Sequence, residues 1–93
     1  MSWKTVTMAG IQSAMTLSDH LGLEKFRKLH GFYEAKDIHM YWHGRGPYEA
    51  RPILAAAFAH LNPSAQAIQS TDFMNNDAHD FLEQHFGFNK RQI

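Results

Sequence analysis

The first third of the chain shows two helical patterns separated by a glycine. Apolar residues between positions 11 and 21 recur at the spacing of one helix face, and Gly22 then ends this helix in a left-handed turn. A shorter helix carries Phe26 and Leu29 on one side, and Gly31 ends it in the same way. The pattern predicts two tightly joined helices of unequal length.

The middle of the chain alternates apolar and polar residues, which is the period of a strand. Within residues 38–43, three apolar side chains are predicted to face the core. The opposite face then carries His39, Tyr41 and His43. Residues 44–47, Gly-Arg-Gly-Pro, indicate a turn, and Tyr48 begins a short returning strand.

The second half shows two more helices and a polar tail. An apolar stripe predicts a helix that begins at Pro52 and stops at Asn62-Pro63. A polar connection leads to the last helix, which ends at Gly87-Phe88. The tail, residues 89–93, ends in an apolar residue that could add a strand.

These elements predict one small α+β domain over residues 1–93, mostly helical, with about four helices and a short antiparallel hairpin or minor sheet. The absence of cysteine excludes disulfides, thiolate nucleophiles and cysteine-ligated metals. Nine Lys and Arg residues balance nine Asp and Glu residues, so any electrostatic contact with nucleic acid must come from a local patch. No secretory leader or membrane-spanning apolar run is visible, which predicts a cytoplasmic protein.

Several short motifs follow one another in a fixed order between residues 9 and 89. They are an Asp-x-x-Gly helix end, a Gly-Phe helix end, a Gly-Arg turn followed by Tyr and Arg, an Ala-rich helix, a Phe before paired Asn, and a closing Gly-Phe. The residues are Asp19, Gly22, Phe26, Gly31, Phe32, Gly44, Arg45, Tyr48, Arg51, Ile53, Ala56, Ala57, Phe73, Asn75, Asn76, Gly87 and Phe88. This order resembles the small DNA-reading modules of McrA-type HNH endonucleases, which are modification-dependent restriction enzymes: their N-terminal head domain and the related sulfur-binding domain.

The resemblance implies a DNA-reading module, either free-standing or part of a longer endonuclease. It implies duplex DNA as the partner, with a methylated base or a phosphorothioate read at the turn. In McrA-type enzymes cleavage belongs to another domain, and no clustered His and Asn for an HNH site can be assembled here. The chain is therefore expected to be non-catalytic, with no cofactor and no metal.

The candidate nucleic-acid contacts gather near the turn and the start of the third helix. Arg45 stands between two glycines, Arg51 precedes a helix N-terminus that attracts phosphate, and Tyr48 offers a ring for stacking. The full candidate set is His43, Arg45, Tyr48, Arg51, Lys90 and Arg91. In the alternative interpretation Arg45 is a solvated turn residue, Tyr48 is core, Arg51 pairs with Glu49 or Asp37, and the tail is frayed.

Two other basic or histidine sets receive structural interpretations. His39 and His43 would lie about 13 Å apart on one strand face, which is too far for a shared metal ion. That face is either an open aromatic platform or is covered by the last helix. The short basic set Lys25, Arg27 and Lys28 is expected to be a solvated helix face.

An acidic set in the last third of the chain supports a different function. Its members are Asp72, Asp77, Asp80 and Glu83. Their negative charges either stabilise the positive N-terminal end of the last helix or form a protein-partner face, as in a small phage-type inhibitor or immunity-type protein. The two functions differ in which surface is open: the basic turn or the acidic helix. An enzyme built on the histidine-rich strand would need a paired nucleophile or an orienting carboxylate, and neither is evident.

Overall fold

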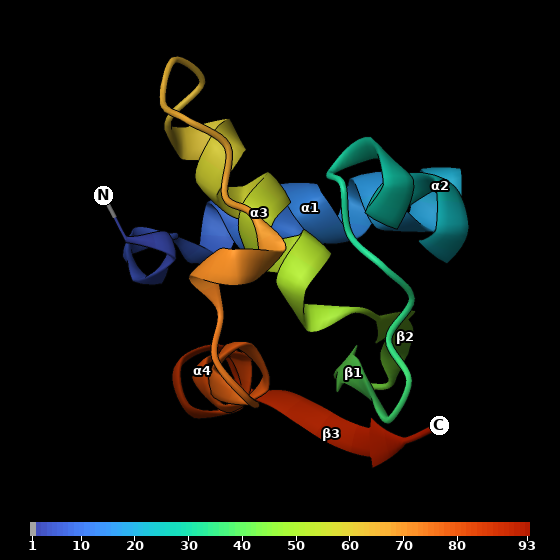
Figure 1. Cartoon of the computed structure of the whole chain (residues 1–93). Coiled ribbons are helices and arrows are strands. Elements are labelled where there is room, and N and C mark those ends of the chain that lie inside the picture. Colours follow the sequence, from blue (N-terminus) through green and yellow to red (C-terminus); the bar gives the residue numbers. More distant parts are fainter. Residues whose placement is uncertain (1) are drawn as a thin grey trace.

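The computed structural model describes residues 2–93 and consists of four α-helices, two short 3-10 helices and one three-stranded antiparallel sheet (Figure 1). The elements in chain order are η1 (Trp3–Thr5), α1 (Met8–Leu21), α2 (Leu23–Leu29), β1 (Ile38–Trp42), β2 (Arg45–Tyr48), α3 (Ala50–Leu61), η2 (Ser70–Asp72), α4 (Asp77–Phe86) and β3 (Phe88–Gln92). This is a small α+β single domain, as the sequence predicted.

A side-chain cap begins the first helix, and a glycine separates it from the second. The Thr7 side chain accepts a hydrogen bond from the Gly10 N–H at 3.2 Å and caps the start of α1. Gly22, with φ of 86°, ends α1, and its N–H donates to the Ser18 carbonyl at 2.8 Å. Since α2 starts at the next residue, the two helices are joined by this single glycine.

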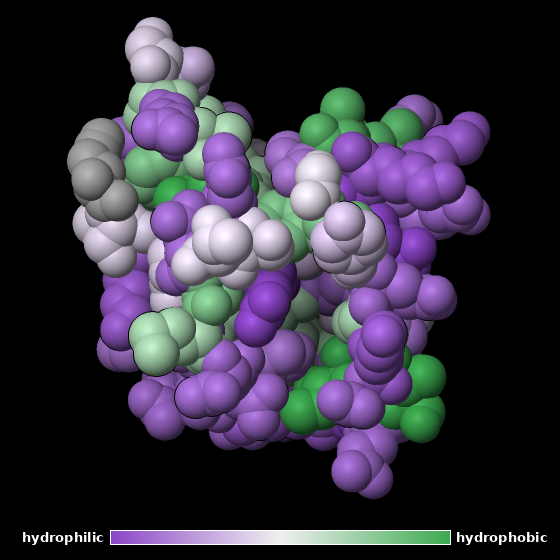
Figure 2. All heavy atoms as spheres, viewed as in Figure 1, coloured by the Kyte–Doolittle hydropathy of each residue, from purple (hydrophilic) through white to green (hydrophobic). Residues whose placement is uncertain are grey.

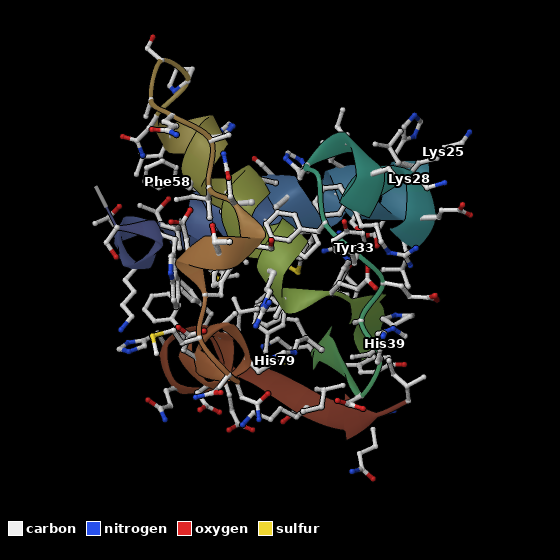
Figure 3. All side chains as sticks on the ribbon, viewed as in Figure 1. Lys25, Lys28, Tyr33, His39, Phe58 and His79 are labelled. Atoms are coloured by element: carbon white, nitrogen blue, oxygen red, sulfur yellow. The ribbon has the colours of Figure 1, made fainter. Side chains whose placement is uncertain are left out.

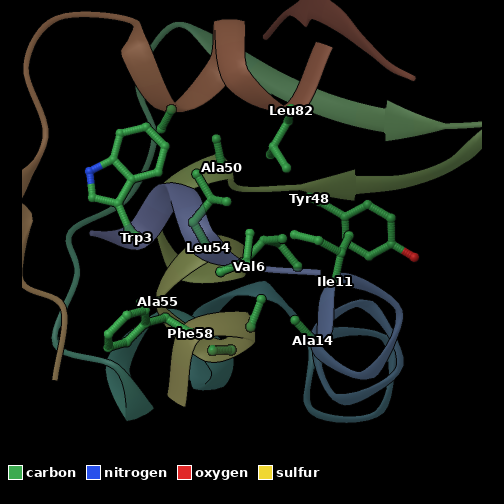
Figure 4. Close-up of a cluster of buried hydrophobic side chains, with 14 of the residues drawn as sticks. Trp3, Val6, Ile11, Ala14, Tyr48, Ala50, Leu54, Ala55, Phe58 and Leu82 are labelled. Atoms are coloured by element: carbon green, nitrogen blue, oxygen red, sulfur yellow. The ribbon is translucent and has the colours of Figure 1, made fainter. Parts of the chain in front are cut away.

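The core forms mainly where α1 and α3 cross. A Cβ atom added to Gly10 would lie 3.1 Å from the Ala57 carbonyl oxygen, so the two backbones approach closely. The surrounding cluster is drawn from all four α-helices and from the sheet, and Figure 4 shows part of it. Its most fully buried members include Ile11, Phe26, Met40, Tyr48, Leu54 and Leu82. The alanine-rich side of α3 therefore permits a close contact between the two helices.

The tail forms the third strand of the sheet. The strand order is β2-β1-β3, and β3 pairs with β1 over its whole length, from Ile38 opposite Gln92 to Trp42 opposite Phe88. In Figure 1 the strand leaves α4 and runs along the lower edge of the domain. The strand suggested for residues 89–93 is confirmed, and the last apolar residue, Ile93, lies just beyond it.

The hairpin turn lies earlier than predicted. His43 and Gly44 both have positive φ, 50° and 78°, and form a two-residue turn between β1 and β2. The prediction of a turn over residues 44–47 was wrong. In this kind of two-residue turn both residues have positive φ, and here they are His43 and Gly44. Residues 45–47 are therefore free to belong to β2. His43 consequently leaves the strand and does not share its outer face with His39 and Tyr41.

The third helix also begins earlier than predicted, at Ala50, with Glu49 as its N-cap residue. Pro52 still lies in the first turn, where its missing N–H removes no helical hydrogen bond. Within residues 2–93, no helix has the length and apolar character needed to cross a bilayer.

Candidate nucleic-acid interface

The sheet has one face toward the core and one face away from it. Met40 is completely buried on the inner side, and the strand register pairs it with Lys90. The alternate positions lie on the outer face, where His39 is opposite Arg91 and Tyr41 is opposite Asn89. We call His39, Tyr41, Asn89 and Arg91 the outer sheet face.

Helix α4 does not cover the outer sheet face. Its contacts with the sheet use inner-side residues: Lys90 pairs with α4 carboxylates, and the Trp42 indole N–H donates to the Phe86 carbonyl at 2.9 Å. His39 points to the side of β1 away from α4 (Figure 3). Of the two arrangements left open by the sequence, the structure contains the open platform.

Tyr41 occupies the centre of this face. The Arg91 guanidinium carbon lies 4.5 Å from the centre of the Tyr41 ring, within the range of a cation–π contact. On the other side the ring lies against β2, because a Cβ atom added to Gly46 would come within 2.8 Å of the Tyr41 ring. The ring and the guanidinium therefore form one aromatic and cationic unit at the surface.

Arg45 and Tyr48 both bind Asp19 at the end of α1. The Arg45 Nε and an Nη atom donate to one Asp19 oxygen at 3.0 and 2.7 Å, and the Tyr48 hydroxyl donates to the other at 2.9 Å. Burial, together with the Asp19 carboxylate, raises the pKa of Tyr48 to about 12. Asp19 thus connects α1 to β2.

The Tyr48 side chain is completely buried. Its ring therefore presents no surface on which a base or sugar could stack, and the core alternative describes it correctly. Arg45 is half-exposed at the start of β2 rather than at the tip of the turn. Its guanidinium is already paired with a carboxylate, which lowers its value as a phosphate contact.

Replacing Asp19 with alanine is expected to lower the free energy of unfolding by about 1–2 kcal/mol, because the Tyr48 hydroxyl and Arg45 lose their shared acceptor. Urea denaturation followed by circular dichroism measures the change. Asp37→Ala is the matched control, since Asp37 is exposed and its carboxylate makes no hydrogen bond or ion pair within residues 2–93. Equal losses in the two variants would contradict the role given to Asp19.

A buried ion pair joins α2 to the start of α3. Glu49 is 2% exposed; one carboxylate oxygen accepts from the Arg27 Nε at 2.8 Å and the other from the Ala35 N–H at 2.8 Å. The hydrogen bond to Glu49 raises the pKa of Arg27. The expectation that Arg27 belongs to a solvated face was therefore wrong, although Lys25 and Lys28 are exposed (Figure 3).

Arg51 has no carboxylate partner in the described part of the chain, so the predicted pairing with Glu49 or Asp37 is not formed. It lies in the first turn of α3, where an Nη atom donates to the Asn75 carbonyl at 3.1 Å. Its guanidinium carbon is 5.5 Å from the centre of the Phe73 ring. Arg51 is thus held in place while its charge remains uncompensated.

Lys90 and Arg91 do not form a common clamp. As neighbours on β3 they point to opposite faces of the sheet, Arg91 outward and Lys90 toward α4. Lys90 hydrogen-bonds Asp80 and lies 3.5 Å from Glu83, and the bond to Asp80 raises its pKa.

The acidic set is engaged within the fold. Asp80 and Glu83 share Lys90, as described above. The Asp72 carboxylate accepts from the Gln69 N–H at 2.8 Å, and that of Asp77 accepts from the Met74 N–H at 3.0 Å. These bonds fit the interpretation of Asp77 as a residue that complements the start of α4.

Two half-buried histidines make the fold sensitive to acid. Burial lowers the pKa of His30, and burial together with the positive charges of Arg51 and Lys90 lowers that of His79. A histidine in the unfolded chain has a pKa of about 6.5, so below that pH the unfolded chain binds protons that the folded chain does not. We expect the free energy of unfolding to be fully present above that pH and to fall as the pH drops toward 5.

Urea denaturation at a series of pH values tests this expectation. The double variant His30→Gln/His79→Gln should flatten the pH dependence, whereas His60→Gln, on an exposed part of α3, should leave it intact. Stability that increases as the pH falls toward 5 would contradict the assignment.

The fold and this surface define a class of protein: a small α+β module that presents an aromatic and cationic sheet face. Within residues 2–93, no three His, Cys, Asp or Glu side chains are grouped to hold a metal ion. The chain belongs to the family of ScoMcrA-like N-terminal head domains, whose model matches residues 4–91. The comparisons with curated proteins and with solved structures give no match.

This membership confirms the resemblance to McrA-type head domains. It places the chain among the DNA-associated domains of McrA-type proteins, in a family distinct from the HNH catalytic domain.

Proposed function

We propose that this domain is a non-catalytic module that binds duplex DNA and distinguishes modified from plain DNA in restriction or defence. Family membership supports the association with DNA. The observation that carries the proposal is the open outer sheet face, on which the exposed Arg91 stacks on Tyr41 without a carboxylate partner in the described chain.

The six predicted contacts divide into three groups. Arg51 and Arg91 carry uncompensated charge and are the proposed phosphate contacts, which would fix the position of the domain on the duplex. His43 is exposed in the hairpin turn and can contact a groove edge. The other three act within the protein in this proposal: Arg45 and Tyr48 hold Asp19, and Lys90 holds α4.

The charge distribution supports this choice of surface. Asp80 and Glu83 pair with the inner-side residue Lys90, so these carboxylates belong to the side of the sheet that α4 covers. A duplex on the outer sheet face would therefore not meet them. For the same reason the alternative, a phage-type inhibitor or immunity-type protein acting through α4, has less support, since Lys90 already neutralises part of that acidic surface.

A duplex titration by fluorescence anisotropy tests the proposal. The duplexes are plain, cytosine-methylated, adenine-methylated and phosphorothioated, each measured at low and at near-physiological salt. We expect one modified duplex to be preferred, and the preference to persist at the higher salt because modification-specific contacts release few counterions. Failure to bind any duplex would overturn the proposal and favour a protein partner for the acidic helix.

A further inference from the structure

A pocket of about 310 Å³ opens beside the first turn of α3, between the segment that follows α2 and the loop that leads into α4. Figure 2 shows the surface hollowed at this point in the middle of the face. Arg51, Asn75, Asn76 and His79 line it on one side, and Tyr33 and Asp37 on the other. Its volume is at the lower end of ligand sites, about 300–1,000 Å³, which suits one planar ring system.

The mouth of the pocket carries an unusually exposed aromatic residue. Tyr33 is 90% exposed, whereas the neighbouring Phe32 is buried in the core. Tyr33, on the segment that follows α2, and His79, on α4, both line the pocket, and both are labelled in Figure 3. Because an exposed tyrosine ring gains little from the fold, its position at the rim is best explained by a flat ligand that stacks on it.

The inner wall offers directional polar groups. The His79 imidazole lines the pocket, and its buried Nδ1 atom has no hydrogen-bond partner within residues 2–93. The Asn75 and Asn76 side chains add amide groups that both donate and accept. Donors and acceptors together match the edge of a nucleobase.

The charges that line the pocket favour a neutral ligand over a free anion. Arg51 and Lys36 contribute positive charge, but Glu34 and Asp37 line the same pocket and balance it. The third carboxylate in the lining, Glu49, is neutralised by its ion pair with Arg27 and adds no net charge to the pocket. A phosphate inside the pocket would face two carboxylates, whereas a base brings no charge and can use the acceptors as well as the donors; the phosphate proposed for Arg51 would therefore lie outside the pocket.

We infer that this pocket receives one nucleobase turned out of the duplex. This inference rests on the proposed function, because the duplex must first lie on the outer sheet face. Asp37 and Ile38 line the pocket and directly precede His39, the first residue of the outer sheet face, so the pocket lies beside the start of β1. The domain would thus examine a base in the pocket rather than at the hairpin turn.

A comparison of two duplexes tests the inference, one fully paired and one identical except for a single central mismatch. Proteins that turn out a base bind the mismatched site more tightly, because the cost of unpairing is already met. We expect anisotropy titrations to give about tenfold tighter binding of the mismatched duplex. Asn76→Trp, which fills the pocket from an exposed position, should remove this preference and leave the affinity for the paired duplex within about twofold.

Tyr33→Ala provides a second variant that does not disturb the core, and it should reduce the preference at least about threefold through lost stacking. Leu29→Ala, also exposed but outside the pocket, is the control and should keep the full preference. Equal affinity of the unmodified protein for both duplexes, or a preference that survives Asn76→Trp and Tyr33→Ala, overturns the pocket while leaving duplex binding in place. Absence of binding to either duplex overturns the proposed function and the pocket together.

Discussion

Replacing Glu49 with alanine is expected to lower the free energy of unfolding by about 3–5 kcal/mol, the largest stability effect we expect from a single substitution in this protein. The Glu49 carboxylate is 2% exposed and neutralises Arg27 while accepting from the Ala35 N–H. Its removal leaves a guanidinium without its counter-charge and a backbone donor without its acceptor. Since small domains are stable by about 5–15 kcal/mol, the variant should be close to unfolding. Urea denaturation monitored by circular dichroism measures the loss.

The chain contains a matched control for this prediction. Glu24 forms an ion pair with Lys28 at the same N–O distance, 2.8 Å, but both side chains are more than two-thirds exposed. Water screens that pair, so Glu24→Ala should change the stability far less than Glu49→Ala does. Similar losses for Glu24→Ala and Glu49→Ala would show that burial does not determine the strength of these pairs.

Removing the two uncompensated arginines should produce the largest effect on DNA binding. We expect the double variant Arg51→Ala/Arg91→Ala to bind duplex DNA about 100-fold more weakly than the unchanged protein. The slope of log affinity against log salt should shrink by about 2, because two phosphate contacts and their released counterions are lost. The variant loses the Arg51 hydrogen bond to the Asn75 carbonyl and two cation–π contacts but no buried ion pair, so the fold should be retained. Anisotropy titrations at several salt concentrations measure both quantities.

The double variant Lys25→Ala/Lys28→Ala removes the same charge from an exposed helix away from the outer sheet face (Figure 3). It should weaken binding only slightly and leave the salt slope nearly unchanged. If both double variants weaken binding to the same extent, long-range attraction rather than contact explains the affinity, and the proposed interface is wrong. If neither does, the phosphate contacts lie elsewhere.

Most of the fold follows from short-range patterns. The helix-ending glycines, the alternation through β1 and the apolar stripes of α3 and α4 predict elements that the structure contains, with boundaries within a few residues. The errors occur where a local signal allows two solutions. A Gly-Arg-Gly-Pro run indicates a turn, yet the two-residue hairpin at His43-Gly44 satisfies the strand twist and leaves the same run free to form β2.

The roles of the candidate site residues were harder to predict from the sequence than the fold was. The candidate residues could be selected by chemistry and by family resemblance, but their roles depend on partners far along the chain. Arg45 lies 26 residues from Asp19, and Arg27 lies 22 residues from Glu49. No periodicity indicates such pairs, so a solvated arginine and a buried, paired one look alike in the sequence. The pocket is built from separate segments of the chain, and no motif or periodicity in the sequence indicates it.

The sequence by itself determined the α+β class, the order of the elements and the family, because these depend on local periodicity, on turn residues and on motif spacing. Only the tertiary structure decided which basic residues keep their charge available. The pairing of strands sends Arg91 to the outer face and Lys90 to α4, and the packing of α1 on β2 brings Asp19 to Arg45. A side chain's charge is a property of the residue, but its compensation is a property of the three-dimensional neighbourhood.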